Sequence, residues 1–263
     1  MTSPYPPPDL RTAVREKYGK IATGEVKGCG CGCATSAAAV SSEVGYTREQ
    51  LAALPDGANL GLGCGNPLQH AALRPGEVVL DLGSGAGMDA FLAAREVGPT
   101  GRVLGVDMTP AMVEKARGNT SRAGVVNVEF RFGEIERLPV ADASVDAIIS
   151  NCVINLSTDK PRVFREAFRV LKPGGRLVVS DLVLERALPD EIRTSLEAYV
   201  GCVAGASMLA DYLGELADAG FEAVTVIERK SYGDAAVFGG EPWLREASKA
   251  IVSAKIRAFK PAA

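Results

Sequence analysis

The sequence predicts an α/β fold with a doubly wound, mostly parallel sheet of seven strands. An unbroken apolar run at residues 77–83 is typical of a strand buried on both faces of a parallel sheet. Strand patterns then alternate with helical patterns as far as residue 183, which indicates βαβ units. Two more strand patterns lie close together near the C-terminus, and we expect them to form an antiparallel edge.

The individual elements follow from local signals. Thr47 and Gln50 have the spacing of a capping box, and Pro110 opens a helix at its first position. Glycines between 201 and 205 are expected to break a mostly helical stretch over 188–220. The predicted strands are residues 77–83, 101–107, 127–133, 145–151, 175–183, 221–230 and 250–259, and the predicted helices are residues 10–19, 47–54, 86–97, 110–123 and 160–171.

Composition narrows the class of protein. The 263 residues carry a formal net charge of -3 and have a mean hydropathy of +0.09. No apolar run approaches the roughly 18 residues of a membrane span, and the first ten residues do not resemble a signal peptide, so we expect a cytoplasmic protein with no membrane partner. Basic residues form no stripe, which disfavours nucleic acid. His70 is the only histidine, so a histidine general base has one candidate.

A glycine-rich turn follows the first strand of the alternation. The segment DLGSGAG at 81–87 lets the backbone turn tightly and approach a ligand. Asp107 ends the next strand, where a carboxylate accepts hydrogen bonds from ribose hydroxyls. A dinucleotide fingerprint would need glycine at position 88, and Met88 stands there instead. The turn therefore predicts a nucleotide-containing cofactor of another kind, with a plain strand–helix turn as the alternative.

This arrangement resembles the first motif of S-adenosylmethionine-dependent methyltransferases, in which an acid precedes three alternating glycines. GEI at 133–135 and LKPGGRL at 171–177 resemble two further segments of that superfamily. The resemblance implies a class I, Rossmann-like methyltransferase fold, with Asp81 near the methionine moiety and Asp107 at the ribose. The cofactor-binding residues it implies are Asp81, Gly83, Ser84, Gly85, Asp107, Met108, Glu134, Ile135 and Asn151.

Three cysteines lie in segments that meet at the expected ligand crevice. Cys152 follows the fourth strand, Cys202 lies in the insertion after the fifth strand, which we expect to form a helical lid, and Cys64 lies in the loop entering the first strand. The carboxyl ends of parallel strands face the crevice, so three thiolates are expected to converge there. Intracellular context favours free or ligating thiols over disulfides. The alternative is that each cysteine is a small buried apolar residue.

A cup of three thiolates suits trivalent arsenic. Thiolates select soft species, and arsenic keeps a lone pair that attacks a sulfonium methyl group with no proton to remove, which fits a chain with one histidine. A hydroxyl or ammonium substrate would need a base. Zinc would prefer a fourth ligand and offers no nucleophile.

The chain also resembles arsenite methyltransferases over about residues 60–210, through LGCGNP, SNCVINL and GCVAGA in this order. The resemblance implies that Cys152 and Cys202 hold As(III), with Cys64 as a further thiol and all three as catalytic residues. It also implies an N-terminal cysteine, for which Cys29, Cys31 and Cys33 are candidates. A thiol reductant, glutathione or thioredoxin, would return oxidised cysteines to thiols.

We therefore expect residues 1–70 to form an N-terminal Cys-rich extension and residues 71–263 a methyltransferase domain. The predicted activity is methyl transfer from S-adenosylmethionine to thiol-bound trivalent arsenic, delivered as a thiol complex, giving methylated arsenicals in arsenic detoxification. The alternatives are a methyltransferase for an organic small molecule and a metalloid-binding redox sensor.

Overall fold

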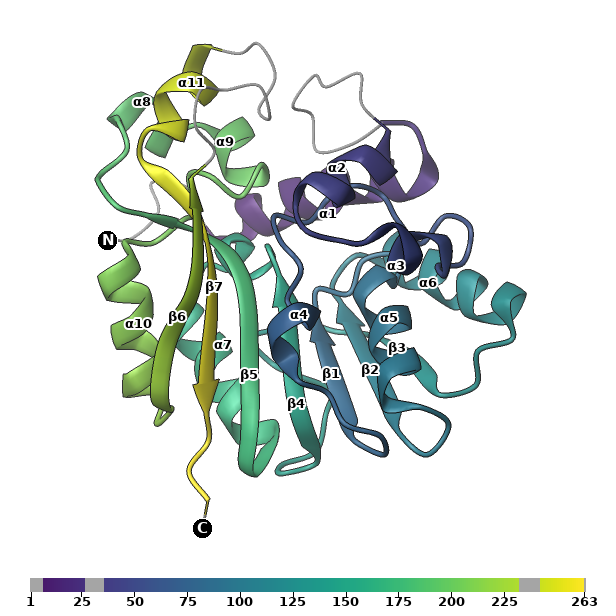
Figure 1. The fold of residues 1–263 in the computed structure, drawn as a ribbon. Helices are drawn as coiled ribbons and strands as arrows, with labels where there is room; N and C mark the ends of the chain where they lie inside the picture. The colour runs from purple at the N-terminus through teal and green to yellow at the C-terminus, as the bar shows by residue number, and fades with distance from the viewer. Residues whose placement is uncertain (1–6, 27–35, 232–241, 263) are drawn as a thin grey trace.

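The computed structural model describes residues 7–26, 36–231 and 242–262. A seven-stranded sheet with the order β3-β2-β1-β4-β5-β7-β6 crosses the molecule, with helices on both faces (Figure 1). The predicted α/β class is confirmed. The strands are β1 Val78–Leu82, β2 Arg102–Asp107, β3 Val128–Phe132, β4 Val145–Asn151, β5 Leu171–Leu184, β6 Glu222–Ser231 and β7 Ile251–Phe259.

Five of the strands, β1 to β5, pair in parallel with one another. Helices α5, α6 and α7 lie in three of the connections between them. β7 lies between β5 and β6 and pairs antiparallel with both. The antiparallel pairing expected for the two C-terminal strands is confirmed. The order reverses direction between β1 and β4, so the crevice outside their carboxyl ends is the place where α/β sheets bind ligands.

The helices largely match the predicted ranges, and α6 has the predicted bounds. α5 begins later than predicted because Gly87, in the left-handed region with φ 99°, is its N-cap. The strand predicted at 175–183 begins earlier, because the backbone becomes extended at Leu171, which pairs with Val145 as part of β5. The helices are α1 Pro7–Thr23, α2 Ala37–Glu43, α3 Arg48–Ala52, α4 Leu68–Ala71, α5 Met88–Val97, α6 Pro110–Ala123, the 3₁₀ helix η1 Ile154–Leu156, α7 Lys160–Val170, α8 Asp190–Arg193, α9 Leu196–Val200, α10 Leu209–Asp218 and α11 Pro242–Ser248.

Alternate side chains of the central strands fill two separate cores. Leu80 and Leu82 of β1 pack toward α7 and α10, where Phe164 and Tyr212 make an edge-to-face contact with ring centroids 5.1 Å apart. Val79 packs on the opposite face with α4, α5 and α6. The sheet is therefore buried on both faces, as its unbroken apolar run predicts.

A third core lies over the carboxyl ends of the strands. It joins α1 with α8, α9, α11 and the segments that carry Cys152 and Cys202, and Leu10 and Val14 of α1 are buried in it. In Figure 1, α1 crosses above the strand ends between α9 and α6. Among the described residues, none of the helices combines the length and apolar character of a membrane span.

The Phe164 core contact gives a stability prediction. Phe164 is fully buried, so Phe164→Ala is expected to lower the free energy of unfolding by about 3–5 kcal/mol through lost burial and a residual cavity. Urea denaturation measures the change. Phe132→Ala is the matched control, because Phe132 is 52% exposed and its loss should cost within about 0.5 kcal/mol. Equal losses in the two variants would contradict this account of the core.

Candidate active site

A pocket opens at the carboxyl ends of β1, β2 and β4. The space between its walls is about 1100 Å³, including a part that is open to solvent. Of the residues predicted to bind a cofactor, the pocket is lined by Asp81, Gly83, Ser84, Gly85, Asp107, Met108, Ile135 and Asn151. The structure therefore brings these segments together around one cavity.

Two glycines of the turn after β1, Gly83 and Gly85, are favoured at their positions for different structural reasons. Gly83 has φ 66°, and a Cβ there would lie 2.4 Å from a methyl carbon of Val153. Gly85 has φ 52°, and a Cβ there would meet nothing within 4 Å. Gly85 therefore leaves open space at the pocket wall, and both positions favour a residue without a side chain.

Asp107 is held by backbone donors at the end of β2. Its carboxylate accepts hydrogen bonds from the amides of Gly85 at 2.9 Å and Thr109 at 2.8 Å. Burial raises the pKa of Asp107, and these amide hydrogen bonds act in the opposite direction. The carboxylate is thus fixed beside the glycine turn with lone pairs left for a ligand hydroxyl.

Asp81 has an oxygen without a partner. Asp81 is 2% exposed, and its Oδ2 has no hydrogen bond among the described residues. Burial raises its pKa well above the usual range, and the neighbouring Asp89 and Asp107 raise it further. Buried acceptors are normally paired, so this carboxyl suits a cationic or hydrogen-bond-donating ligand group.

Asn151 lies in the pocket wall, but its polar atoms bind the protein. Its Oδ1 accepts from the amide of Cys64 at 3.1 Å, and its Nδ2 lies within hydrogen-bond distance of the carbonyl of Gly65 at 2.7 Å, Asp89 at 3.1 Å and the Tyr46 hydroxyl at 3.0 Å. Tyr46 in turn donates to Asp89 at 2.6 Å. Asn151 therefore links the pocket to the loop that carries Cys64.

The structure gives Glu134 a different place from the predicted one. Glu134 is not among the lining residues; it forms ion pairs with Arg11 at 3.3 Å and Arg15 at 2.7 Å, both on α1. Glu136 lines the pocket instead, where it accepts a 2.6 Å hydrogen bond from Ser157 and pairs with Arg11. These contacts fasten α1 over the pocket.

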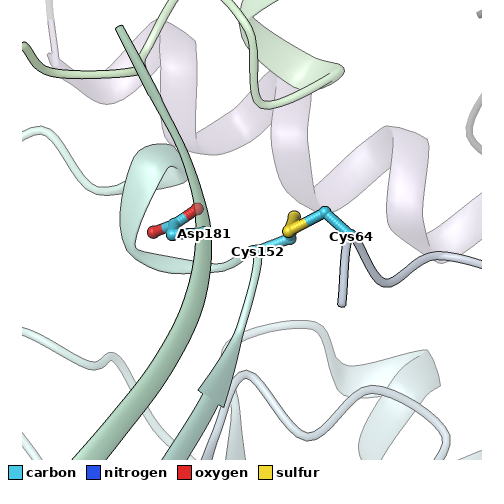
Figure 2. A group of neighbouring side chains, drawn as sticks. All are labelled: Cys64, Cys152 and Asp181. Carbon is cyan, nitrogen blue, oxygen red and sulfur yellow. A yellow bond between two sulfur atoms is a disulfide. The ribbon is translucent and has the colours of Figure 1, made fainter. Parts of the chain in front are cut away.

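Cys64 and Cys152 form a disulfide with a Cα–Cα distance of 5.9 Å (Figure 2). This corrects the expectation of free thiols at these two positions. The loop of Cys64 lies against the ends of β4 and β5, and the Cys152 amide donates to the carbonyl of Ser180 at 2.9 Å. Two cysteines from segments far apart in the sequence therefore lie within bonding distance at the pocket edge, where Cys152 is a lining residue.

Cys202 is buried beside Cys152, and its sulfur contacts the backbone of Cys152. Its thiol donates to the carbonyl of Cys152 at 3.0 Å, and the Tyr18 hydroxyl lies 3.9 Å from the sulfur. Burial raises the pKa of Cys202 to about 12. Cys152 and Cys202 have φ of 57° and 65°, a conformation that L residues rarely adopt and that is concentrated at functional sites.

The three sulfurs do not form one cluster in this oxidised state. Among the described residues, the group of three potential ligands within 4.8 Å of one another is Cys64, Cys152 and Asp181. Burial raises the pKa of Asp181 to about 7, although the positive charge of Lys160 acts in the opposite direction. The candidate ligands Cys29, Cys31 and Cys33 lie outside the described residues.

Known proteins resemble this chain in sequence and in fold. Residues 73–230 match the family described as "Methyltransferase domain". The chain is 48% identical to an arsenite methyltransferase of Halobacterium salinarum over 275 aligned positions, which cover 100% of this chain and 69% of that protein. The chain belongs to the arsenite methyltransferase family.

Two further known proteins are similar to this chain, one in sequence and the other in sequence and structure. The human arsenite methyltransferase is 44% identical over 137 residues, which cover 49% of this chain and 36% of the human protein. The crystal structure of an arsenic(III) S-adenosylmethionine methyltransferase from Chlamydomonas reinhardtii superposes with a TM-score of 0.67 at 35% identity, covering 87% of this chain and 75% of that one.

Several lining residues of this family member were not singled out from its sequence. Asp89 lies two residues after Gly87, so its closeness to the first motif was the signal that could have identified it. Tyr46 and Glu136 lie in connecting segments whose path the sequence pattern does not determine. Arg11 and Tyr18 lie in a predicted helix, but nothing in the pattern indicates that this helix covers the strand ends.

The Asp107 contacts give a prediction about cofactor affinity. Asp107→Ala should weaken binding of S-adenosylhomocysteine by about 1.5–3 kcal/mol, because it removes a charged acceptor from the pocket. Isothermal titration calorimetry measures the dissociation constant. Asp142→Ala is the control, since Asp142 is an exposed acid outside the pocket lining. An unchanged dissociation constant for Asp107→Ala would remove this residue from the site.

The close fit of the Cys64 loop gives a second prediction. A Cβ at Gly65 would lie 1.9 Å from Oγ of Ser180, so Gly65→Ala must shift the Ser180 side chain or the backbone beside Cys64. We expect the backbone to shift, because Ser180 is fully buried. A shift of about 1 Å can slow a reaction about 100-fold, and we expect this loss in the rate of Cys64–Cys152 disulfide formation, measured by quenched alkylation and mass spectrometry.

Two companion variants make that test specific. Gly65→Ala combined with Ser180→Ala should regain most of the rate, because the clashing oxygen is gone. Gly214→Ala should leave the rate unchanged, since a Cβ there meets nothing within 4 Å. Disulfide formation at the wild-type rate in Gly65→Ala alone would contradict the proposed role of this fit.

Proposed function

We propose that this chain transfers a methyl group from S-adenosylmethionine to trivalent arsenic held on its own cysteine thiolates. The observation that carries the proposal is the meeting of Cys64 and Cys152 at the edge of the ligand pocket, with Cys202 packed on Cys152. Relatives named as arsenite methyltransferases support the arsenic substrate. In this proposal residues 1–70 form an extension that supplies Cys64, and residues 71–263 form the methyltransferase domain.

The pocket suits S-adenosylmethionine, which carries a cationic sulfur and an ammonium group. Asp81, Asp89, Asp107 and Glu136 line the pocket, and among its described lining residues Arg11 is the one base. The unpaired Oδ2 of Asp81 and the unpaired Oγ of Ser84 are buried polar atoms that a bound ligand would satisfy. Asp107 would hold the ribose hydroxyls, and Gly85 would allow close approach.

The protein's part in the methyl transfer is to hold and orient arsenic. When bound, S-adenosylmethionine supplies an electrophilic methyl group; the arsenic lone pair takes it, the electrons of the broken methyl–sulfur bond stay on sulfur, and arsenic becomes formally pentavalent. Cys152 lines the pocket, and Cys202 is buried beside it, so arsenic on these thiolates lies at the pocket wall. Alignment of two reactants can provide effective molarities of about 10⁵ M or more.

The disulfide accounts for the return of arsenic to the trivalent state. Pentavalent arsenic needs two electrons, and two thiolates supply two electrons when they become one disulfide. Cys64 and Cys152 are joined in this way in the structure. A small thiol such as glutathione, or thioredoxin, then reduces the disulfide by exchange. We place the enzyme in the cytoplasm, where such reductants keep thiols reduced, and its biological role in arsenic detoxification.

The direct test follows the methyl group. Reduced full-length protein is incubated with arsenite, methyl-labelled S-adenosylmethionine and glutathione or thioredoxin, and arsenic species are separated by chromatography. We expect label in methylated arsenic over multiple turnovers. Binding of S-adenosylhomocysteine without labelled arsenic would overturn the arsenic substrate and leave an organic acceptor or a redox sensor.

The thiol ligands give a prediction of their own. Cys152→Ser and Cys202→Ser should each abolish arsenite methylation, because a serine hydroxyl is a hard, weakly acidic ligand that does not hold a soft metalloid. Their affinity for S-adenosylhomocysteine should stay within about twofold of wild type, which calorimetry checks. Near wild-type turnover of arsenite by either variant would refute a catalytic role for that thiol.

A further inference from the structure

Asp181 of β5 lies beside the Cys64–Cys152 pair, and the proposed function gives it no role so far. A carboxylate oxygen of Asp181 and the two sulfurs are all within 4.8 Å of one another. Figure 2 shows Cys152 just beyond the end of β4, between Cys64 and Asp181, which lies within β5. Asp181 has no solvent exposure. An atom bonded to both sulfurs would therefore have this carboxylate among its immediate neighbours, without competition from bulk water.

The carboxylate is fixed in place and keeps an acceptor position. Its Oδ1 accepts from Nδ2 of Asn155 at 2.8 Å and from the amide of Leu182 at 3.0 Å. Its Oδ2 has one described partner, the Tyr212 hydroxyl at 3.3 Å. A carboxylate oxygen accepts two hydrogen bonds, so Oδ2 has room for a second donor.

Arsenite chelated by two thiols provides such a donor. When two arsenic–oxygen bonds are replaced by arsenic–sulfur bonds, the two thiol protons leave with the hydroxides as two waters. No electrons are transferred, and one hydroxyl stays on arsenic. In a trivalent arsenical that already carries one methyl group, a methyl occupies that third position, and a methyl group cannot donate.

We propose that Asp181 is a specificity-determining residue of the metalloid site, which accepts a hydrogen bond from the hydroxyl of arsenite chelated by reduced Cys64 and Cys152. This rests on the proposed function and adds a loading step to it: arsenite enters on the Cys64–Cys152 pair, and Cys202 then replaces the hydroxyl. The carboxylate favours inorganic arsenite over methylated trivalent arsenicals at this step.

The test uses a variant that keeps only the cysteine pair Cys64 and Cys152. The chain has six cysteines, and serine at Cys29, Cys31, Cys33 and Cys202 leaves Cys64 and Cys152 alone. In this background, reduced with a phosphine and without cofactor, equilibrium dialysis measures the affinities for arsenite and for methylarsonous acid. The ratio of the two affinities is the result, because it does not depend on the fraction of protein that is folded.

Asp181→Asn should lower the affinity for arsenite about tenfold or more and leave that for methylarsonous acid within about twofold, since a hydrogen bond to a charged group is worth at least about one factor of ten. The amide oxygen is expected to take the position of Oδ1, which two donors hold, so its NH₂ replaces the acceptor Oδ2. Tyr212→Phe is the matched control, because it removes the other partner of Oδ2 and keeps the acceptor, so the ratio should not fall.

The outcomes separate this proposal from the proposed function. An equal change for both arsenicals in Asp181→Asn, or no change for either, overturns the role of Asp181 even if the wild-type protein methylates arsenite. The same fall of the ratio in Tyr212→Phe also overturns it. A selective loss for arsenite in Asp181→Asn supports it, and this result stands even if labelled methyl groups never reach arsenic in the wild-type protein.

Discussion

The structure depends most on the contact between the Cys64 loop and the end of β4. Asn151, the last residue of β4, uses its side-chain amide to hold the backbone of Cys64 and Gly65 on one side and reaches Asp89 and Tyr46 in the cofactor pocket on the other. A Cβ at Gly63 would lie 2.6 Å from this amide. The loop is therefore packed tightly against the strand end, and this fit brings Cys64 to Cys152.

The sheet topology places the cofactor pocket next to the cysteines. The carboxyl ends of β1 and β2 present the acids and glycines of the cofactor pocket. Cys152 lies just beyond the end of β4, and Asp181 lies beside it within the carboxyl-terminal half of β5. The segments before β1 and after β5 then cover this edge and add Cys64 and Cys202. A methyl donor and a soft acceptor can be held side by side because parallel strands place all four ends together.

Much of this was predictable from local signals, and the rest depends on side-chain contacts. The unbroken run at 77–83, the glycine turn and Pro110 predict the sheet and its helices because each has a local physical cause. The same signals place Asp81 and Asp107 at strand ends. They do not predict that Glu134 pairs with α1 while Glu136 faces the pocket, because both lie in an irregular segment. The disulfide and the nearness of Asp181 follow from tertiary packing that has no periodicity in the sequence.

In the proposed function, the cysteines that hold arsenic also supply the two electrons that return it to the trivalent state. A single-turnover experiment can measure both events at once. Fully reduced protein, freed of reductant, receives one equivalent each of arsenite and S-adenosylmethionine, and after an acid quench both arsenic speciation and cysteine oxidation are measured by mass spectrometry. The account predicts trivalent methylated arsenic and a Cys64–Cys152 disulfide in equal amounts. Methylated arsenic with Cys64 and Cys152 both still present as thiols would contradict it.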